Sequence, residues 1–385
     1  MEVRSRFLHE PRGSFFLFGP RGTGKSTWLK TLHPDALYID LLLPDIHRSY
    51  LARPERLLEA LDAHPEEKLV IIDEVQRVPD LLPTVHHLVE ARRDTRFILT
   101  GSSASKLRRA GTDLLAGRLL VRTMHPYLAS ELGSDFSLEE SLKYGMVPLV
   151  VESADRRERT QAYVGMYVKE EIQAEGLVRN AGNFARFLET VSFCHAAPLN
   201  VATVARDSGV ERKTVEGYLS ILEDLLLSFR VPVFRRRAKR ILTSHEKIYL
   251  FDAGIFRALR PTGPMDRAAE AEGPALEGLV AQHVRAWAAA RGRDNELFFW
   301  RTKAGLEVDL VLYGEDGLWA FEVKNSRNVH RVELRALREF KQDYPEARCL
   351  LLYRGSERLR IDGVLCLPCT EFLRGLRPDG DLAPG

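Results

Sequence analysis

The sequence predicts an α/β protein of three domains: an α/β domain with a parallel sheet, a helical middle domain, and a second, smaller α/β domain. Three observations support this prediction. The chain has 385 residues, too many for one core and enough for two or three. A glycine-rich loop stands between a strand pattern and a helix pattern at residues 14–30. Strand patterns that end in acidic residues recur at residues 298–325.

The composition is that of a folded protein, with 45% hydrophobic and 29% charged residues. The formal net charge of +2 does not by itself indicate a polyanionic partner, so any evidence for such a partner must come from local clusters of basic residues. The chain has four cysteines, at Cys194, Cys349, Cys366 and Cys369. They are too few and too unevenly spaced for a disulfide framework, which predicts a cytoplasmic protein. Zinc binding at Cys366 and Cys369 would need further ligands that no nearby spacing supplies. No apolar stretch is long enough to span a membrane, and charges occupy the N-terminus where a signal peptide needs its apolar core.

Residues 19–26 read G-x-x-x-x-G-K-S, with an apolar strand pattern before them and a helix start after them. Glycines let the backbone amides approach a phosphate, and the helix that opens at Lys25 adds its positive dipole end. We expect Lys25 to reach the β- and γ-phosphates of ATP, and Ser26 to ligate Mg²⁺. The residues expected to contact the nucleotide here are Gly19, Pro20, Arg21, Gly22, Thr23, Gly24, Lys25, Ser26 and Thr27.

A second strand is predicted at 36–40 and a helix at 54–63. Residues 68–76 then form an apolar run that ends in Asp73 and Glu74, the pattern of a strand buried on both faces. The carboxyl edge of an open α/β sheet is where such folds bind their ligand. We expect Asp73 to hold Mg²⁺ through water, and Glu74 to polarise the water that attacks the γ-phosphate.

The next predicted strand, 96–103, ends in small hydroxyl residues. Thr100 or Ser102 would sense the γ-phosphate, although a polar turn explains them nearly as well. Residues 12–150 resemble the AAA-type P-loop ATPases, in the branch with Gly-Ser-Ser after this strand and Leu-Ala-Gly-Arg at 115–118. The resemblance implies a homo-oligomer and makes Arg118 a candidate reporter on the γ-phosphate, from its own subunit or as an arginine finger from a neighbour. A solvated surface arginine is the alternative.

A charged segment at 152–159 marks the predicted boundary of the middle domain, where helices are expected from 161 to 176 and from 183 to 193. Residues 199–210 and 211–222 predict two helices joined by a turn at Gly209, the helix-turn-helix signature. The strand pattern at 228–234 and the basic run after it would form a wing. In a DNA-binding version, one set of residues faces the major groove and another contacts phosphate: Arg212, Lys213 and Thr214, then Arg235, Arg236 and Arg237. Many such modules contact proteins instead.

After a buried strand at 247–254, in which Asp252 is expected to cap a helix, residues 261–264 read as a linker. A helix is predicted at 273–290, and strands at 298–301, 307–312 and 318–325. Alternation places Glu322 and Lys324 on one face of their strand, and Glu307 and Asp309 on one face of theirs. Carboxylates in this pattern would bind Mg²⁺, and the lysine would orient or deprotonate the attacking water, as in a metal-dependent phosphodiesterase.

This segment resembles the PD-(D/E)XK nuclease fold, in the version appended to P-loop ATPases as a C-terminal domain of unknown function. The helix residue Glu277, Asp309, and the pair Glu322 and Lys324 match its motif positions. The resemblance implies a metal site at Glu277, Asp309 and Glu322, with catalytic roles for Asp309, Glu322 and Lys324. The same array could be a structural remnant that binds nucleic acid without cutting it. Basic residues around it would line a groove for the DNA backbone, or be solvated: Arg301, Lys303, Arg327 and Arg331.

The predicted domains are therefore a P-loop AAA-like ATPase domain at 1–152, a winged helix-turn-helix domain at 153–260, a nuclease-like domain at 261–375 and a loose tail at 376–385. We expect an ATPase whose nucleotide state positions the winged helix and an active nuclease on DNA. The alternative is a nucleotide-switched module that binds DNA or protein and whose nuclease fold is inactive. A nucleotide kinase is disfavoured because no segment reads as a lid over a phosphate acceptor.

Overall fold

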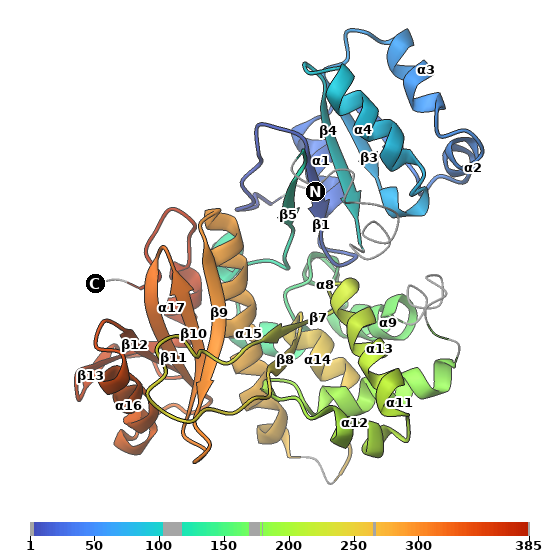
Figure 1. Cartoon of the computed structure of the whole chain (residues 1–385). Helices are drawn as coiled ribbons and strands as arrows, with labels where there is room; N and C mark the ends of the chain where they lie inside the picture. The colour runs from blue at the N-terminus through green and yellow to red at the C-terminus, as the bar shows by residue number, and fades with distance from the viewer. Residues whose placement is uncertain (1–3, 103–117, 169–177, 179, 265–266, 384–385) are drawn as a thin grey trace. The chain divides into compact units, whose positions relative to one another are not determined.

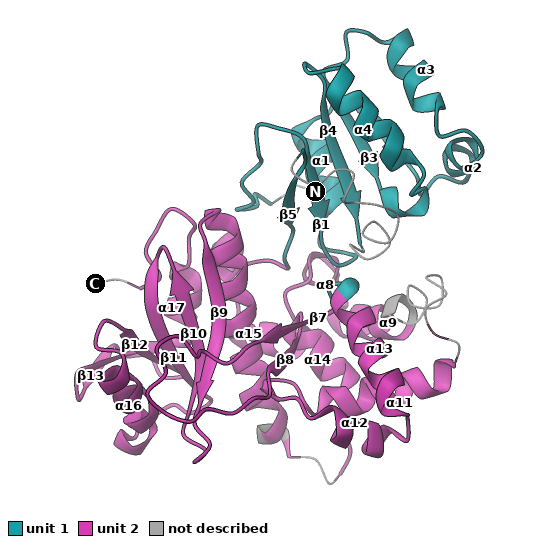
Figure 2. Ribbon diagram, viewed as in Figure 1, with its two compact units in different colours: residues 1–125, 224–226 teal, residues 126–223, 227–385 magenta. Residues whose placement is uncertain are grey.

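A computed structural model describes residues 4–102, 118–168, 178, 180–264 and 267–383, with backbone only at 166–168 and 268–269 (Figure 1). The chain divides into two compact units (Figure 2). Unit 1 consists of residues 1–125 and 224–226, and unit 2 of residues 126–223 and 227–385. The predicted boundary at residue 152 falls inside unit 2, because Tyr127, Leu132 and Met146 pack in the same core as the helices near residue 280.

Unit 1 is an α/β domain whose described strands pair in parallel in the order β2-β3-β4-β1-β5. Its elements are β1 (Phe15–Phe18), α1 (Lys25–Leu32), β2 (Leu37–Asp40), α2 (Pro44–Ala52), α3 (Arg56–Ala63), β3 (Leu69–Asp73), η1 (Val75–Arg77), α4 (Leu81–Ala91), β4 (Arg96–Gly101) and β5 (Leu120–Thr123). Both faces of the sheet are covered. Trp28 and Leu29 of α1 pack with Phe15 and Ile71 on one face, and the residues of α3 and α4 fill the other.

This arrangement confirms the predicted strand and helix around the glycine-rich loop, which connects β1 to α1. It also confirms the buried strand that ends at Asp73, since Val70, Ile71 and Ile72 are fully buried. The carboxyl ends of parallel strands meet at one edge of a sheet, so the loop after β1 and the residues after β3 and β4 share that edge.

The first part of unit 2 is mostly helical. Its elements are α6 (Ala129–Leu132), η3 (Gly133–Asp135), α7 (Leu138–Tyr144), α8 (Pro148–Val151), α9 (Arg156–Ala162), η4 (Tyr163–Val168), α11 (Ala181–Ser192), β6 (Ala197–Pro198), α12 (Val201–Ser208), α13 (Arg212–Asp224), β7 (Ser228–Val231), β8 (Lys247–Leu250) and α14 (Ala253–Leu259). The two helices predicted around Gly209 are α12 and α13; Gly209 ends α12 with φ 63°. Asp252 caps α14 as predicted, since its carboxylate accepts hydrogen bonds from Gly254 N and Ile255 N.

The strand predicted at 228–234 is shorter than expected, and the wing stays a prediction. β7 ends at Val231, and β6, β8 and β7 form a small antiparallel sheet. Pro232 has no N–H for a ladder, and its carbonyl accepts from Phe299 N at 3.0 Å instead. Phe234 N donates to Phe299 O at 2.7 Å, so this stretch lies along the edge of the C-terminal sheet.

The C-terminal part of unit 2 is a mixed sheet with order β13-β14-β12-β11-β10-β9 among its described strands. Its elements are α15 (Ala268–Arg291), β9 (Asn295–Arg301), β10 (Glu307–Gly314), β11 (Gly317–Lys324), η5 (Arg331–Leu334), α16 (Arg335–Asp343), β12 (Arg348–Tyr353), β13 (Leu359–Ile361), β14 (Val364–Pro368) and α17 (Cys369–Gly375). Helices α15 and α17 pack on one face of this sheet and α16 on the other. Among the described residues, no helix combines the length and apolarity needed to cross a membrane.

Candidate nucleotide site and acidic cluster

The loop of residues 19–26 has the backbone shape that its glycines permit. Gly22 and Gly24 have φ of 79° and 89°, a region that side-chain-bearing residues rarely adopt. Gly24 is the N-cap of α1, so the positive end of that helix opens at the loop. A Cβ on Gly19 would lie 2.5 Å from Met124 O, which explains why this position also needs glycine.

Lys25 lies folded against this loop. Its ammonium donates to Gly19 O at 2.6 Å and to Pro20 O at 3.4 Å, and the residue is 5% exposed. The Thr23 hydroxyl donates to Pro20 O at 2.7 Å, which tightens the loop. The lysine predicted to reach the phosphates is therefore held at the loop that would cradle them.

Thr100 connects Asp73, the last residue of β3, with Glu74, which follows the strand. Its hydroxyl donates to Asp73 Oδ1 and accepts a hydrogen bond from Glu74 N at 2.9 Å. Asp73 is 1% exposed and Thr100 is fully buried, so these bonds lie away from solvent. The structure thus gives Thr100 a definite task, the orientation of Asp73 and Glu74, in addition to any contact with a phosphate.

The Glu74 side chain is also held. Gln76 Nε2 donates to Glu74 Oε2 and to Ser102 Oγ, the latter at 3.0 Å. Ser102 Oγ lies 3.4 Å from Glu74 Oε2. A Cβ on Gly101 would lie 2.8 Å from Gln76 Oε1, so glycine there leaves room for this amide. The predicted residues Glu74 and Ser102 are brought together, and Gln76 is a member of the group that the sequence pattern did not single out.

Tyr38 was also missed. Its hydroxyl donates to Asp73 Oδ2 at 2.6 Å. Burial, followed by the charge of Asp73, raises the pKa of Tyr38, while a hydrogen bond with Ser26 lowers it. Tyr38 therefore lies between Asp73 and Ser26, the two residues predicted to hold Mg²⁺. Its only sequence signal was its place on the strand beside β3.

Arg118 contacts helix α4 through an ion pair with Glu90. Its guanidinium pairs with Glu90 Oε1 at 2.7 Å, and the arginine side chain is 43% exposed. The other residues of the Leu-Ala-Gly-Arg motif, 115–117, and Ser103 lie outside the described residues. The role predicted for Arg118 stays a prediction.

The residues predicted to contact DNA lie on two separate elements. Arg212, Lys213 and Thr214 occupy the first turn of α13, where Arg212 pairs with Glu216 of the same helix at 3.0 Å. Arg235, Arg236 and Arg237 lie in the segment along β9. Arg235 donates to Thr243 O at 2.9 Å, and Arg236 pairs with Glu296 at 3.4 Å and lies 4.5 Å from the Tyr313 ring centroid. Part of the second basic set thus has partners within the chain.

In the C-terminal sheet, the predicted acids of β10 and β11 meet. Asp309 Oδ2 accepts from Val323 N at 2.8 Å, and Glu322 lies next to it on β11. Lys324 donates to Glu322 Oε1, as expected from their shared face of the strand. Glu322 is 5% exposed, and among the described residues its Oε2 has no hydrogen-bond partner.

A lysine that the sequence pattern did not reveal completes this cluster. The fully buried Lys247, the first residue of β8, pairs with Glu277 at 2.8 Å and with Glu307 at 2.5 Å. Its ammonium lies 3.4 Å from Asp309 O and 3.8 Å from Asp309 Oδ1. The Tyr249 hydroxyl donates to the same Glu277 oxygen, Oε1, at 2.6 Å.

Burial dominates the acid–base behaviour of this cluster. It raises the pKa of Glu277 to about 7, although the Lys247 ammonium beside it acts in the opposite direction. Burial and then the charge of Asp309 raise the pKa of Glu322 well above its usual range. Burial alone would lower the pKa of Lys247, but Glu277 and its neighbours hold it above the usual range, so the ammonium is charged. Across the described residues, no three His, Cys, Asp or Glu side chains converge closely enough to hold a metal ion.

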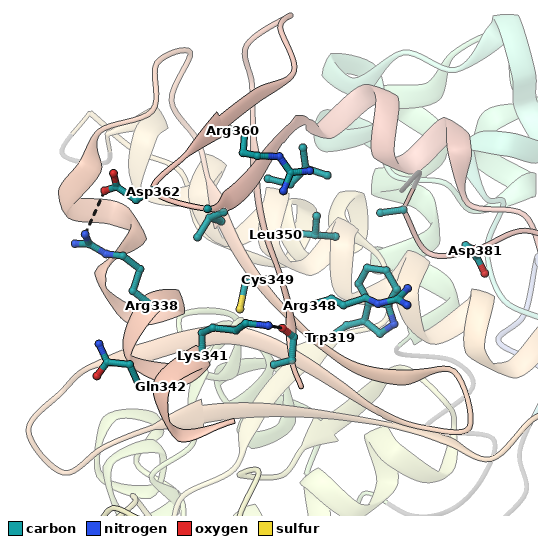
Figure 3. A pocket seen from close by; sticks show the side chains of 15 residues that line it. Trp319, Arg338, Lys341, Gln342, Arg348, Cys349, Leu350, Arg360, Asp362 and Asp381 are labelled. Carbon is teal, nitrogen blue, oxygen red and sulfur yellow. Dashed lines mark hydrogen bonds and ion pairs between the residues drawn. The ribbon is translucent and has the colours of Figure 1, made fainter. Parts of the chain in front are cut away.

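A cavity of about 740 Å³ lies at the opposite end of this sheet (Figure 3). Its lining includes Trp319 and Arg348, at the amino ends of β11 and β12, and Arg360 of β13. Arg348 lies over the Trp319 ring at 5.0 Å. Glu322 and Lys324 are at the carboxyl end of β11 and do not line it, so the cavity belongs to a different surface from the acidic cluster.

Family models match the chain in three segments. Residues 12–133 match the model described as "AAA domain". Residues 135–266 and 272–372 match two models described as domains of unknown function, DUF8612 and DUF4143. Each covers about a third of the chain or less.

Two curated relatives are 28% identical over 368 residues, which is 93% of this chain and 80% of theirs: uncharacterized protein Mb2031c of Mycobacterium bovis and uncharacterized protein Rv2008c of Mycobacterium tuberculosis. Among solved structures, AMPPCP-bound DnaA from Aquifex aeolicus is 14% identical, with coverage of 55% of this chain and 81% of that one and a TM-score of 0.25. Protein VC1899 from Vibrio cholerae is 11% identical, with coverage of 94% and 96% and a TM-score of 0.24. Scores this low add nothing to the assignment. Residues 12–133 are thus similar to an AAA domain, and the loop at 19–26 within them has the backbone conformation of a phosphate-binding loop.

Proposed function

We propose that unit 1 binds ATP with Mg²⁺ and hydrolyses it, with Glu74 as the residue that polarises the attacking water. The observation that carries this proposal is the buried Thr100 hydroxyl, which joins Asp73 to Glu74 at the sheet edge shared with the phosphate loop. Lys25 moves from Gly19 O onto the β- and γ-phosphates when nucleotide binds. Loop amides and the N-terminus of α1 supply the remaining positive potential.

The residues present fit Mg²⁺ in this site. Ser26 and Asp73 offer a hydroxyl and a carboxylate, the hard oxygen ligands that this ion prefers, and both lie at the Tyr38 hydroxyl. Mg²⁺ bound with ATP neutralises charge on the β- and γ-phosphates. Tyr38 keeps Asp73 oriented toward Ser26, and Gln76 with Ser102 keeps Glu74 from turning away.

Turnover of ATP by Glu74→Gln tests the catalytic assignment. The amide cannot polarise water as a carboxylate does, so we expect turnover to fall at least about 100-fold while nucleotide affinity stays within a few fold. The matched control is Glu66→Gln, on an exposed carboxylate of unit 1. A Glu74→Gln protein that turns over within a few fold of wild type would overturn the assignment.

Arg118 is proposed to act on the γ-phosphate of a neighbouring subunit in a homo-oligomer. The half-exposed ion pair with Glu90 contributes about 1 kcal/mol or less, so this pair by itself does not fix Arg118 to α4. Arg118→Ala mixed with Lys25→Ala should recover part of the turnover if sites are shared between subunits. Absence of recovery would indicate that Arg118 acts on the nucleotide of its own subunit.

The acidic cluster of unit 2 supports a second candidate function, magnesium-dependent cleavage of DNA. The specific observation is Glu322, whose buried Oε2 lacks a partner among the described residues while its other oxygen accepts from Lys324. Asp309 and Glu322 fit one Mg²⁺ held mainly by water, since this ion commonly uses one or two protein carboxylates. Lys324 would orient the attacking water.

Labelled single- and double-stranded DNA with Mg²⁺ or Mn²⁺ tests this candidate, using wild type, Lys324→Ala and a control, Lys143→Ala, at an exposed lysine of α7. We expect cleavage by wild type and the control and loss with Lys324→Ala. Equal survival of DNA with wild type and Lys324→Ala would leave the alternative, a nucleotide-switched module whose nuclease fold is inactive.

In either case Arg212, Lys213 and Thr214 are the proposed DNA contacts of α13, and a DNA-mobility assay with Lys213→Ala tests them.

A further inference from the structure

One cation of the acidic cluster of unit 2, Lys247, comes from outside the segment that matches the C-terminal family model. Lys247 belongs to β8, within residues 135–266, whereas its partners Glu277, Glu307 and Asp309 lie within residues 272–372. Lys247 and Tyr249 are two residues apart on β8, so both face the same way, and both reach Glu277 Oε1.

The ammonium of Lys247 is fully engaged. It has three hydrogen atoms to donate, and three acceptors lie within reach: the Glu277 and Glu307 carboxylates and the Asp309 carbonyl. The lysine is fully buried, so water does not compete for these bonds. A buried charge that lost such partners would be strongly disfavoured, and the arrangement is therefore a stable part of the fold.

The charges of the cluster are almost balanced without any metal ion. Four carboxylates, Glu277, Glu307, Asp309 and Glu322, face three cations, Lys247, Lys324 and Arg301, the last of which pairs with Glu307 at 3.1 Å. A divalent ion coordinated by Glu277 would have to share that carboxylate with an ammonium and a phenol. The repulsion between the ammonium and the metal ion makes that position unfavourable.

We propose that Lys247 is the built-in cation of this cluster: it takes the place that a metal ion would otherwise have at Glu277, and restricts divalent-ion binding to Asp309 and Glu322. Glu277 then serves as a positioning residue that fixes Lys247 and Tyr249, and not as a metal ligand. The inference deepens the second proposed function and rests on it only for the Asp309–Glu322 ion. The place of Lys247 does not depend on DNA cleavage.

Two isosteric variants separate the two carboxylates. Binding of Mn²⁺ is measured by electron paramagnetic resonance on the full chain without nucleotide, in wild type, Glu277→Gln and Glu322→Gln. We expect Glu322→Gln to weaken Mn²⁺ binding at least about tenfold, because it removes a ligand, and Glu277→Gln to leave the affinity within about twofold. Equal weakening by both variants would overturn the proposal, since Glu277 would then be a ligand.

Lys247→Met provides the second measurement. Removal of the ammonium leaves three acids together, so this variant should have a lower melting temperature than wild type in EDTA. Mn²⁺ should then raise its melting temperature by more degrees than it raises that of wild type. A Mn²⁺ shift no larger than in wild type would contradict the proposal.

These outcomes are distinguishable from failure of the nuclease candidate. If wild type binds no Mn²⁺ and cuts no DNA, the proposed metal site at Asp309 and Glu322 is wrong. A larger Mn²⁺-induced rise in the melting temperature of Lys247→Met would still support the role of Lys247. A second outcome is that wild type cuts DNA and that Glu277→Gln and Glu322→Gln weaken Mn²⁺ binding equally. This result would support the nuclease and contradict the inference. If Lys247→Met does not fold, the pair of glutamine variants decides alone.

Discussion

The buried His283 makes the stability of unit 2 depend on acid in a way that can be worked out from the structure. This residue of α15 is fully buried. Its Nε2 accepts from Ala129 N at 3.0 Å, and its Nδ1 lies 2.8 Å from Leu279 O, so the neutral ring carries its proton on Nδ1. Protonation of Nε2 would bring two donors face to face. Burial lowers the pKa of His283 from 6.5 to about 4.

The sign of the effect follows from linkage. Below pH 6.5 the unfolded chain takes up a proton at this residue that the folded chain refuses until about pH 4, so stability is lost as the pH falls through that window. Each pH unit inside the window is worth about 1.4 kcal/mol, which integrates to about 2 kcal/mol between pH 7 and pH 5. Glu277 and Asp252 have raised pKa values and act with the opposite sign, so the residue must be isolated by comparison with a variant.

His283→Gln is that variant, because its amide can donate and accept but does not titrate. A Trp28→Phe background leaves three of the four tryptophans, Trp287, Trp300 and Trp319, all in unit 2. Their fluorescence then follows urea unfolding of unit 2 alone at pH 7 and pH 5. We expect the background protein to lose about 2 kcal/mol more than His283→Gln over this interval. An equal loss in both proteins would refute the reasoning.

Two further predictions follow from close contacts. Thr100→Val removes the hydroxyl that orients Asp73, and should lower ATP turnover at least about tenfold with nucleotide affinity within a few fold, measured by steady-state hydrolysis and calorimetry; unchanged turnover would exclude an orienting role. Gly254→Ala places a Cβ 2.1 Å from the backbone of Tyr144 and should cost about 1–3 kcal/mol in urea unfolding, whereas Gly273→Ala, with nothing within 4 Å, should be neutral or stabilising. Equal effects of the two alanines would contradict the packing of α14 on α7.

Much of unit 1 could be predicted from local pattern. The strand that ends at Asp73 is read from its continuous apolar run, and the loop at 19–26 from glycine spacing, because both signals lie within a few consecutive residues. The shared face of Glu322 and Lys324 follows from strand alternation alone.

The residues that were missed depend on contacts between distant parts of the chain. Lys247 meets Glu277 from 30 positions away, and Tyr38 meets Asp73 from 35. Neither has a spacing or a neighbour that marks it, since a lysine at the start of a strand is usually solvated. The course of the chain after Val231 could not be predicted for the same reason. Hydrogen bonds with the distant Phe299 determine it, and no local sequence pattern indicates these bonds.

The central claim is that the loop at 19–26 holds a nucleoside triphosphate through Lys25. The most direct test is isothermal titration calorimetry, in which nucleotide-free full-length protein is titrated with a non-hydrolysable ATP analogue in the presence of Mg²⁺. The account predicts one nucleotide site per chain in wild type, and at least about a hundredfold weaker binding in Lys25→Ala. Circular dichroism checks that the Lys25→Ala variant is folded. No heat of binding in wild type, or equal affinity in Lys25→Ala, would contradict it.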